Sequence, residues 1–324
     1  EIGALGGTAG GDVGPGSSTS SGRSFRVGWN NQNTIFAGQI LADGANTVTK
    51  VGTGNWTLTG ANTYNGGTIV DGGTLTVNNA SGSGTGTGSV NVNNTATLAG
   101  TGIISGATTI NSGATNSPGN NGIGTLTING AVLLTNSILS SDLAGVTTVG
   151  GGVNDLLQVN GNLVLSGQVI VRPNALAGTL ATGTYRLINY TGTLTGGAAN
   201  LIADAPGYII SFDTSTPGQI NMVVSGAAST VTWTGFNGPL NSPQWDLGFT
   251  TNFTDGVNPV VFQNGQNVVF DNTGTYASGQ IPVSINMVGP VNYGALYPAA
   301  VTVNTTNNVT LTSPGEIGRA SCRE

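Results

Sequence analysis

Carboxylates are the side chains of this sequence that could carry acid–base chemistry. Outside Glu1 and the last nine residues, every one of them is an aspartate. Two carboxyl groups roughly 5–9 Å apart would suit the hydrolysis of a glycosidic bond. The sequence contains no histidine, which excludes serine–histidine and cysteine–histidine nucleophiles and the usual zinc ligand sets. Any catalysis would therefore have to rest on a pair of aspartates.

The ten aspartates are spread singly along the chain, and several of them precede glycine or asparagine. Asp next to Gly is typical of a turn, because the carboxylate binds the local backbone and the residue tolerates the left-handed conformation. We therefore predict structural roles for most of them. A glycosidase hypothesis requires two of Asp155, Asp204 and Asp213 to share an open groove. The full set is Asp12, Asp43, Asp71, Asp142, Asp155, Asp204, Asp213, Asp246, Asp255 and Asp271.

Glycine-rich stretches come close to ligand-binding motifs without completing them. Residues 150–155 (Gly-Gly-Gly-Val-Asn-Asp) are similar to a calcium-binding nonapeptide, but the pattern does not repeat. It offers a single carboxylate, whereas calcium needs several converging oxygens. Residues 82–88 and 119–124 lack the Lys-Ser/Thr that completes a phosphate-binding loop. We predict no catalytic, cofactor-binding or metal-binding residues.

Threonines recur in Thr-x-Thr pairs, such as Thr57/Thr59 and Thr74/Thr76. Aligned on one face of a sheet, their hydroxyls could order water or ice, or contact a glycan. Threonine also has a high β propensity, and any half-buried strand can alternate it with an inward-facing Leu or Val. The pairs are irregularly spaced and need not align, so we favour the structural interpretation.

The composition narrows the classes of partner. Only 6% of the 324 residues are charged, the net charge is −6, and 55 residues are glycine. Lys50 is the only lysine, so the basic cluster that phosphate backbones require is missing and nucleic acid is not an expected partner. No apolar run reaches the roughly 18 residues of a membrane-spanning helix. The chain does not begin with Met, and we expect it to be an internal fragment.

Residues 50–77 carry the clearest structural signal. They contain three short β-prone pieces, Trp56–Thr59, Thr68–Val70 and Thr74–Val77, separated by corners rich in glycine and asparagine. No stretch here holds a helical period. The pattern predicts an all-β chain.

Aliphatic residues recur every six positions in several series, each with its own phase. Six residues accommodate a short strand and a tight corner, which is how a β-solenoid builds its rungs. A meander of hairpins could give similar spacing, and Asn65-Gly66 and Asp71-Gly72 would suit hairpin turns. We favour the solenoid, because such short strands would not form stable isolated hairpins. The series are Ile69 and Leu75; Val92, Leu98, Ile104 and Ile110; Leu126, Val132 and Ile138; and Leu157, Leu163 and Val169.

Changes of pattern predict five segments along the chain. The last nine residues break the composition abruptly and look like a translated sequencing adapter, so we expect them to be non-native. The predicted segments are a flexible Gly/Ser-rich lead-in (1–34), solenoid rungs (35–153), a closing or capping β section with longer strands (154–226), the truncated start of a second β repeat unit (227–315), and the tail (316–324).

Residues 50–77 resemble the autotransporter-associated β-strand repeat, also called the passenger-associated transport repeat, of secreted bacterial proteins. Residues 183–192 resemble the closing section of such a unit, and residues 231–235 with 262–271 resemble the opening of another. The resemblance implies a right-handed β-helix. It also implies export through an outer-membrane translocator and a secreted or cell-surface location associated with the outer membrane.

We therefore expect a structural or adhesive passenger or stalk segment without catalysis or cofactor. A glycan or another molecule of a host cell surface is the expected ligand. Two alternatives stay open, a carbohydrate-active β-helix that uses aspartates and a glycan-binding module.

Overall fold

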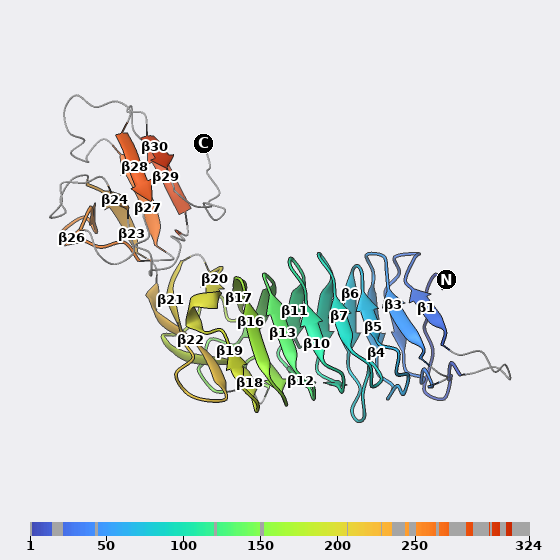
Figure 1. The fold of residues 1–324 in the computed structure, drawn as a ribbon. Helices are drawn as coiled ribbons and strands as arrows, with labels where there is room; N and C mark the ends of the chain where they lie inside the picture. Colours follow the sequence, from blue (N-terminus) through green and yellow to red (C-terminus); the bar gives the residue numbers. More distant parts are fainter. Residues whose placement is uncertain are drawn as a thin grey trace. The chain divides into compact units, whose positions relative to one another are not determined.

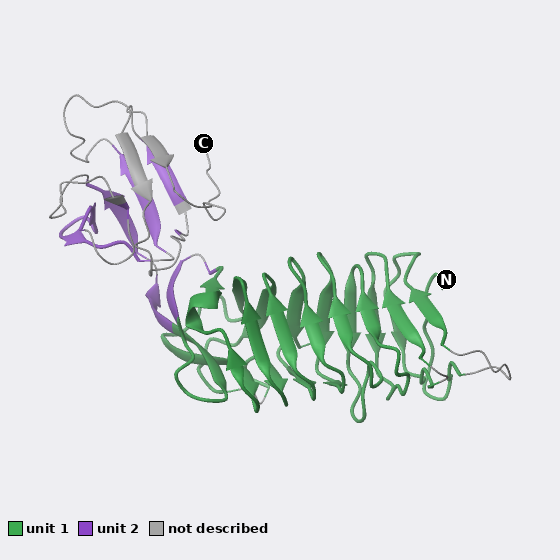
Figure 2. Ribbon diagram, in the orientation of Figure 1, with its two compact units in different colours: residues 1–204, 212–223 green, residues 205–211, 224–324 purple. Residues whose placement is uncertain are grey.

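The structure of the chain is a computed structural model, and its described residues form two compact units. Figure 2 shows unit 1, which comprises residues 1–204 and 212–223, and unit 2, which comprises residues 205–211 and 224–324. The described residues are 2–14, 22–42, 45–119, 122–149, 152–205, 207–227, 229–234, 244–245, 251–263, 266–271, 283–287, 298, 300–304 and 309–312.

Unit 1 is a β-solenoid whose strands stack in three sheets (Figure 1). The first sheet has the order β1 (Ser24–Val27), β3 (Thr47–Lys50), β5 (Thr68–Val70), β7 (Val90–Val92), β10 (Thr108–Ile110), β13 (Val132–Thr135), β16 (Leu163–Ser166) and β19 (Leu194–Thr195). The second has the order β2 (Thr34–Phe36), β4 (Asn55–Leu58), β6 (Thr74–Val77), β8 (Thr97–Gly100), β11 (Thr115–Pro118), β14 (Ile138–Leu143), β17 (Val169–Ala175) and β20 (Leu201–Ala203). The third contains β9 (Ile103–Ile104), β12 (Thr125–Ile128), β15 (Leu156–Val159), β18 (Gly183–Tyr190) and β22 (Gln219–Ala227).

The six-residue spacing places one aliphatic side chain on each face of a rung. Val92 lies on β7, Leu98 on β8 and Ile104 on β9, and all three are fully buried. The next member, Ile110, pairs with Val92 one rung further on. An interior column of apolar side chains therefore runs along the solenoid, and the predicted all-β solenoid fold is confirmed.

The alternative of a hairpin meander is wrong for unit 1. Asp71-Gly72 connects β5 to β6, but these two strands belong to different sheets. Each pairs in parallel with strands from the neighbouring rungs. The glycine corners turn the chain from one face of the solenoid to the next.

Two members of the predicted aliphatic series lie outside the core. Ile69 is 36% exposed, while Thr68 and Val70 on either side of it are buried. Ile138 is half-buried, and the next residue, Leu139, points inward. In a strand, a shift of one residue moves a side chain to the opposite face, which a count of six cannot detect.

Rungs differ in length because corners absorb extra residues. Asn111 lies 18 residues after its partner Asn93, and Asn160 lies 31 residues after Asn129. Parallel register is kept through both intervals. This explains why each aliphatic series has its own phase.

The described residues of the predicted flexible lead-in take part in rungs. Ile2 pairs with Val27, and Gly7 pairs with Phe36. Val13 pairs with Ile40, so residues 2–14 make three parallel bridges with the rung that follows them in the chain. Residues 15–21, the Gly/Ser-rich part, lie outside the described residues.

Unit 2 has a separate core built from aromatic side chains. Trp233 contacts Phe253 edge-on, with 5.1 Å between ring centroids, and Trp245 contacts Phe262 in the same way at 5.1 Å. One sheet has the order β26 (Pro259–Val260), β25 (Phe253–Thr254), β23 (Thr230–Trp233), β27 (Asn267–Asp271) and β29 (Ala300–Asn304), and the other has the order β24 (Gln244–Trp245), β28 (Val283–Met287) and β30 (Val309–Thr312).

Helical structure is almost absent from the part of the chain that is described. It amounts to one 3₁₀ turn, η1 (Ala198–Asn200), and the remaining element is the strand β21 (Tyr208–Asp213). None of the described helical segments has the length and apolarity needed to cross a membrane.

Candidate functional site

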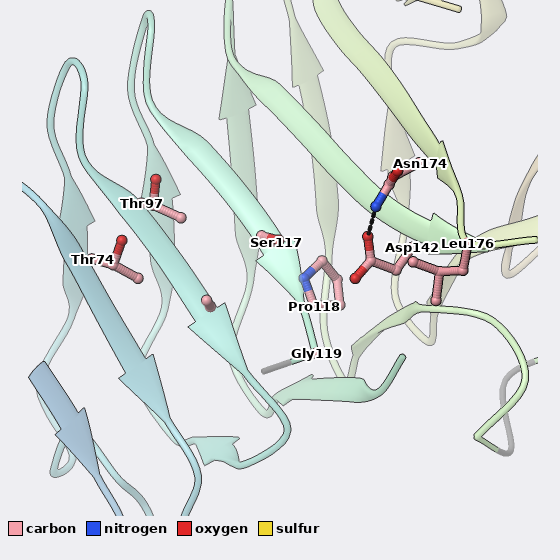
Figure 3. Close-up of a pocket in the computed structure, with 9 residues that line it drawn as sticks. Thr74, Thr97, Ser117, Pro118, Gly119, Asp142, Asn174 and Leu176 are labelled. Atoms are coloured by element: carbon pink, nitrogen blue, oxygen red, sulfur yellow. Dashed lines mark hydrogen bonds between the residues drawn. The ribbon is translucent and has the colours of Figure 1, made fainter. Parts of the chain in front are cut away.

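A groove lies on the second sheet of unit 1, at a step in strand length. The strands β6, β8 and β11 have four residues each, whereas β14 has six and β17 has seven. The longer strands continue past the ends of the shorter ones and leave a groove of about 420 Å³ beside them (Figure 3). Its lining residues are Thr74, Thr97, Ala99, Ser117, Pro118, Gly119, Asp142, Asn174 and Leu176.

Small residues at the end of β11, and Ala99 beside them, form the floor of the groove. Ala99 pairs with Ser117, and Pro118 ends β11. After it, Gly119 adopts a φ of 90°, and its N–H donates to the carbonyl of Gly100 at 2.8 Å. Because these side chains are short, the floor lies below the neighbouring surface.

A carboxylate and an amide form the wall. Asp142 on β14 and Asn174 on β17 are register partners, and Asn174 Nδ2 donates to Asp142 Oδ1 at 2.8 Å (Figure 3). Asp142 is half-buried and Asn174 is exposed. Leu176 extends the wall with a side chain that is 49% exposed. The wall therefore combines hydrogen-bonding groups with an apolar end.

Three lining hydroxyls lie on the other strands of the groove. Thr74 pairs with Thr97, and Thr97 pairs with Thr115, so these threonines form a ladder across three rungs. The ladder does not align the Thr-x-Thr pairs as pairs, because Thr76 lies opposite Ala99. The corners between strands differ in length, so residues at irregular sequence spacing still pair in register. The third hydroxyl of the lining is that of Ser117.

Asp155 lies directly behind the groove, with its carboxylate closed off. Its Oδ1 accepts the N–H of Gly124 and its Oδ2 accepts the N–H of Asp142, both at 2.7 Å. The residue is 1% exposed, and burial raises the pKa of Asp155 to about 7. Both oxygens are engaged by backbone amides, so this carboxylate holds the fold together.

The other two aspartates of the glycosidase hypothesis have their own local partners. Asp204 forms an exposed ion pair with Arg172 at 2.8 Å. Asp213 accepts the N–H of Ser215 at 2.8 Å, and hydrogen bonds from Ser215 lower the pKa of Asp213. Neither residue lines the groove, where Asp142 is the only carboxylate. No turn signal or motif in the sequence marks Asp142.

Most of the remaining described aspartates bind neighbouring chain segments. Asp255 accepts the N–H groups of Val257 and Asn258, as predicted for an Asp-Gly turn. Asp71 accepts a hydrogen bond from Asn93 of the next rung at 2.6 Å, and Asp12 accepts the N–H of Gln39. Asp43 and Asp246 lie outside the described residues.

The glycine-rich segment that resembles a calcium loop is closed by an asparagine. Asn154 Oδ1 accepts the N–H of Ala144, and its Nδ2 donates to the carbonyls of Val146 and Thr148. Gly150 and Gly151 lie outside the described residues. Among the described residues, no three His, Cys, Asp or Glu side chains gather as a metal site would require.

Lys50 is a buried basic group, and no pattern in the sequence predicts its burial. It occupies the interior column between Val27 and Val70 and is 1% exposed. Its Nζ donates to the carbonyls of Val51, Gly52 and Gly72 at 2.8, 3.1 and 3.1 Å. Burial lowers the pKa of Lys50 to about 8. The side chain ties corners of two rungs together from the inside.

Comparison with known proteins agrees with this architecture. The family model described as Passenger-associated-transport-repeat matches residues 48–77, which run from β3 to β6. The chain is also 37% identical over 215 residues to the Adhesin BmaC autotransporter of Brucella suis biovar 1 (strain 1330).

That alignment covers 65% of this chain and 6% of the adhesin, so the chain corresponds to a small part of its relative's length. The two similarities confirm the expected resemblance to autotransporter passenger repeat proteins. They also support secretion to the cell surface, in association with the outer membrane.

Proposed function

We propose that this chain is a structural and adhesive passenger segment of a secreted bacterial β-helix protein, and that it has no catalytic activity. The observation that carries the proposal is the stacking of parallel strands from β1 to β20 over one mainly apolar interior. Such a stack gives an extended scaffold, because each rung needs only its neighbours for stability. Loops and faces of the scaffold are then available for contact with other molecules.

The similarity to an adhesin supports the adhesive part of the proposal. The likeness of the chain to a passenger repeat supports a translocator as a partner of the longer protein. A glycan or a host-cell surface molecule is the proposed ligand. We also propose that the longer strands of residues 154–226 serve to close the solenoid, and that residues 227–315 are the truncated start of a second repeat unit.

The non-enzymatic part rests on the chemistry of the groups present. The sequence contains no histidine, and the groove contains a single carboxylate, Asp142. The adjacent Asp155 has both oxygens bound by backbone N–H groups. A pair of free carboxyls at glycosidase spacing is therefore not formed at this groove.

The test is display of the full chain on the surface of non-adherent bacteria through a heterologous anchor. We expect more cells to attach to an epithelial monolayer than with the core variant Val92→Asp, which places a charge in the apolar column and should not fold. Equal attachment of the two would overturn the adhesive function. Release of reducing ends from polysaccharides by the purified chain would overturn the absence of catalysis.

A further inference from the structure

The groove on the second sheet is a feature that a purely structural stalk does not need. Its lining offers hydroxyl groups from Thr74, Thr97 and Ser117 and, opposite them, the hydrogen-bonded pair of Asp142 and Asn174. Carboxylate oxygens only accept hydrogen bonds, amides both donate and accept, and hydroxyls do both. This set matches a ligand that is itself rich in hydroxyl groups.

The charge of the lining selects against an anionic ligand. The groove contains one carboxylate and no lysine or arginine. The nearby Arg172 is held by Asp204 in an ion pair at 2.8 Å. A sulfated, phosphorylated or sialylated ligand would bring a negative charge to Asp142 without a cation to balance it, so a neutral ligand fits better.

The direction of the groove indicates an extended ligand. Its lining residues lie on, or directly after, the successive strands β6, β8, β11, β14 and β17 of one sheet. Neighbouring strands are about 4.8 Å apart, so four intervals span about 19 Å. Its volume of about 420 Å³ lies within the range of small-molecule sites, roughly 300–1,000 Å³. Pro118 and the half-exposed Leu176 supply apolar contact for the hydrophobic face of a sugar ring.

We propose that this groove binds a neutral linear oligosaccharide. Asp142 and Asn174 would hydrogen-bond two hydroxyls of one sugar unit, and the hydroxyls of Thr74, Thr97 and Ser117 would contact the following units. The proposal rests on the proposed adhesive function and names the ligand class of one site within it. Binding without cleavage follows, because Asp155 is the other nearby carboxylate and is already engaged by two backbone amides.

A second place where a sugar could stack provides an internal comparison. Trp29 is 51% exposed, and the guanidinium carbon of Arg26 lies 5.6 Å from its ring centroid. The cation already covers one ring face. Glycan binding at the groove should therefore not depend on Trp29.

The experiment is an array of neutral and anionic oligosaccharides probed with the purified full chain, followed by titration calorimetry on the best neutral ligand. We expect binding to neutral linear glycans only. Asp142→Asn and Asn174→Ala should each weaken binding up to about ten-fold, the effect of losing or weakening one hydrogen bond to the ligand. Ser117→Trp should abolish binding, because the new side chain fills the floor of the groove.

Matched variants control for charge, bulk and stacking. Asp255→Asn removes one negative charge from unit 2, Ser81→Trp adds the same bulk at an exposed corner of unit 1, and Trp29→Ala removes the exposed ring. These three should bind as the wild type does. Circular dichroism and an unfolding midpoint for each variant identify any that fails to fold, and Asn174→Ala, at an exposed position, remains informative if Ser117→Trp does not fold.

Two results would overturn the proposal. One is that no neutral oligosaccharide on the array binds the chain. The other is that folded Asp142→Asn and Asn174→Ala bind the neutral ligand as tightly as the wild type does. If bacteria displaying the chain still attach to cells under either result, the adhesive function stands and only the groove is excluded as its site. If the bacteria do not attach to cells while the groove binds glycans, the glycan site stands and the adhesive function is excluded.

Discussion

At the scale of single residues, a buried lysine and a buried aspartate distinguish unit 1 from a purely apolar solenoid. Lys50 and Asp155 are each 1% exposed, and neither has an oppositely charged partner among its hydrogen bonds. Burial without a counter-charge disfavours the charged form. Lys50 therefore has a lowered pKa and Asp155 a raised one, and both make stability depend on pH.

Replacing Lys50 by methionine should destabilise unit 1 by about 1–3 kcal/mol at pH 7, because three carbonyls lose their donor while the volume is kept. The wild type should become more stable between pH 8 and 10.5, since only the unfolded chain keeps the lysine proton there. Urea titrations across this range measure both effects. If the free energy of unfolding of Lys50→Met still rises between pH 8 and 10.5, another group causes the rise.

Asp155 should make the free energy of unfolding change with pH in the opposite direction, and at lower pH. Between pH 3.8 and 7 the native carboxyl keeps a proton that the unfolded chain has lost, so the free energy of unfolding should fall as pH rises through this interval. In Asp155→Asn the slope should flatten. The variant should also be less stable by about 1–3 kcal/mol at acidic pH, because an amide NH₂ cannot accept one of the two backbone N–H bonds. An unchanged slope would remove Asp155 as its source.

At the scale of elements, the solenoid depends on corners that bring backbone segments of adjacent rungs very close. Gly100 ends β8 with a φ of 124°, and any Cβ at this position would collide with the carbonyl of Val77 in the rung below. Strand length is then decided by where such corners fall. The step that forms the groove arises because β14 and β17 lack an early corner.

Gly100→Ala should therefore lower the unfolding free energy by about 2 kcal/mol or more, through both a strained φ and the backbone collision. The matched control is Gly3→Ala, where φ is unstrained and the nearest atoms to a Cβ are 3.7 Å away. It should change stability by less than about 0.5 kcal/mol. Chemical denaturation followed by circular dichroism compares the two. Equal effects would contradict the role given to the corner.

At the scale of the whole molecule, the two units differ in the chemistry of their cores. Unit 1 buries mainly aliphatic side chains, whereas unit 2 buries a cluster around Trp233, Trp245 and Phe253. Separate cores imply separate cooperative transitions. The chain should then unfold in two steps.

Trp233→Phe should shift the transition of unit 2 to lower denaturant and leave that of unit 1 unchanged. The lost packing of an indole ring against Phe253 and Phe270 gives the physical reason. Far-UV circular dichroism reports on both units, and the fluorescence of the remaining tryptophans helps to separate them. Equal shifts of both transitions would mean that the units unfold together.

The sequence by itself determined the class of fold. Short β-branched pieces between glycine corners, with one aliphatic residue every six positions, leave stacked parallel rungs as the way to pair such short strands. Because the sequence contains no histidine and a single lysine, it also excluded histidine-based catalysis and a lysine-rich binding site for phosphate groups. Positions such as Ile69 and Ile138 were misassigned, because one residue decides which face a side chain occupies.

Only the tertiary structure decided where the groove lies and which residues line it. Thr74, Thr97 and Asn174 are far apart in the chain and meet because rungs of unequal length are brought into register. The burial of Lys50 and the two backbone contacts of Asp155 likewise depend on segments one rung away. Local sequence patterns carry the period of a strand and the place of a corner, but the number of residues looped out between rungs sets which side chains become neighbours.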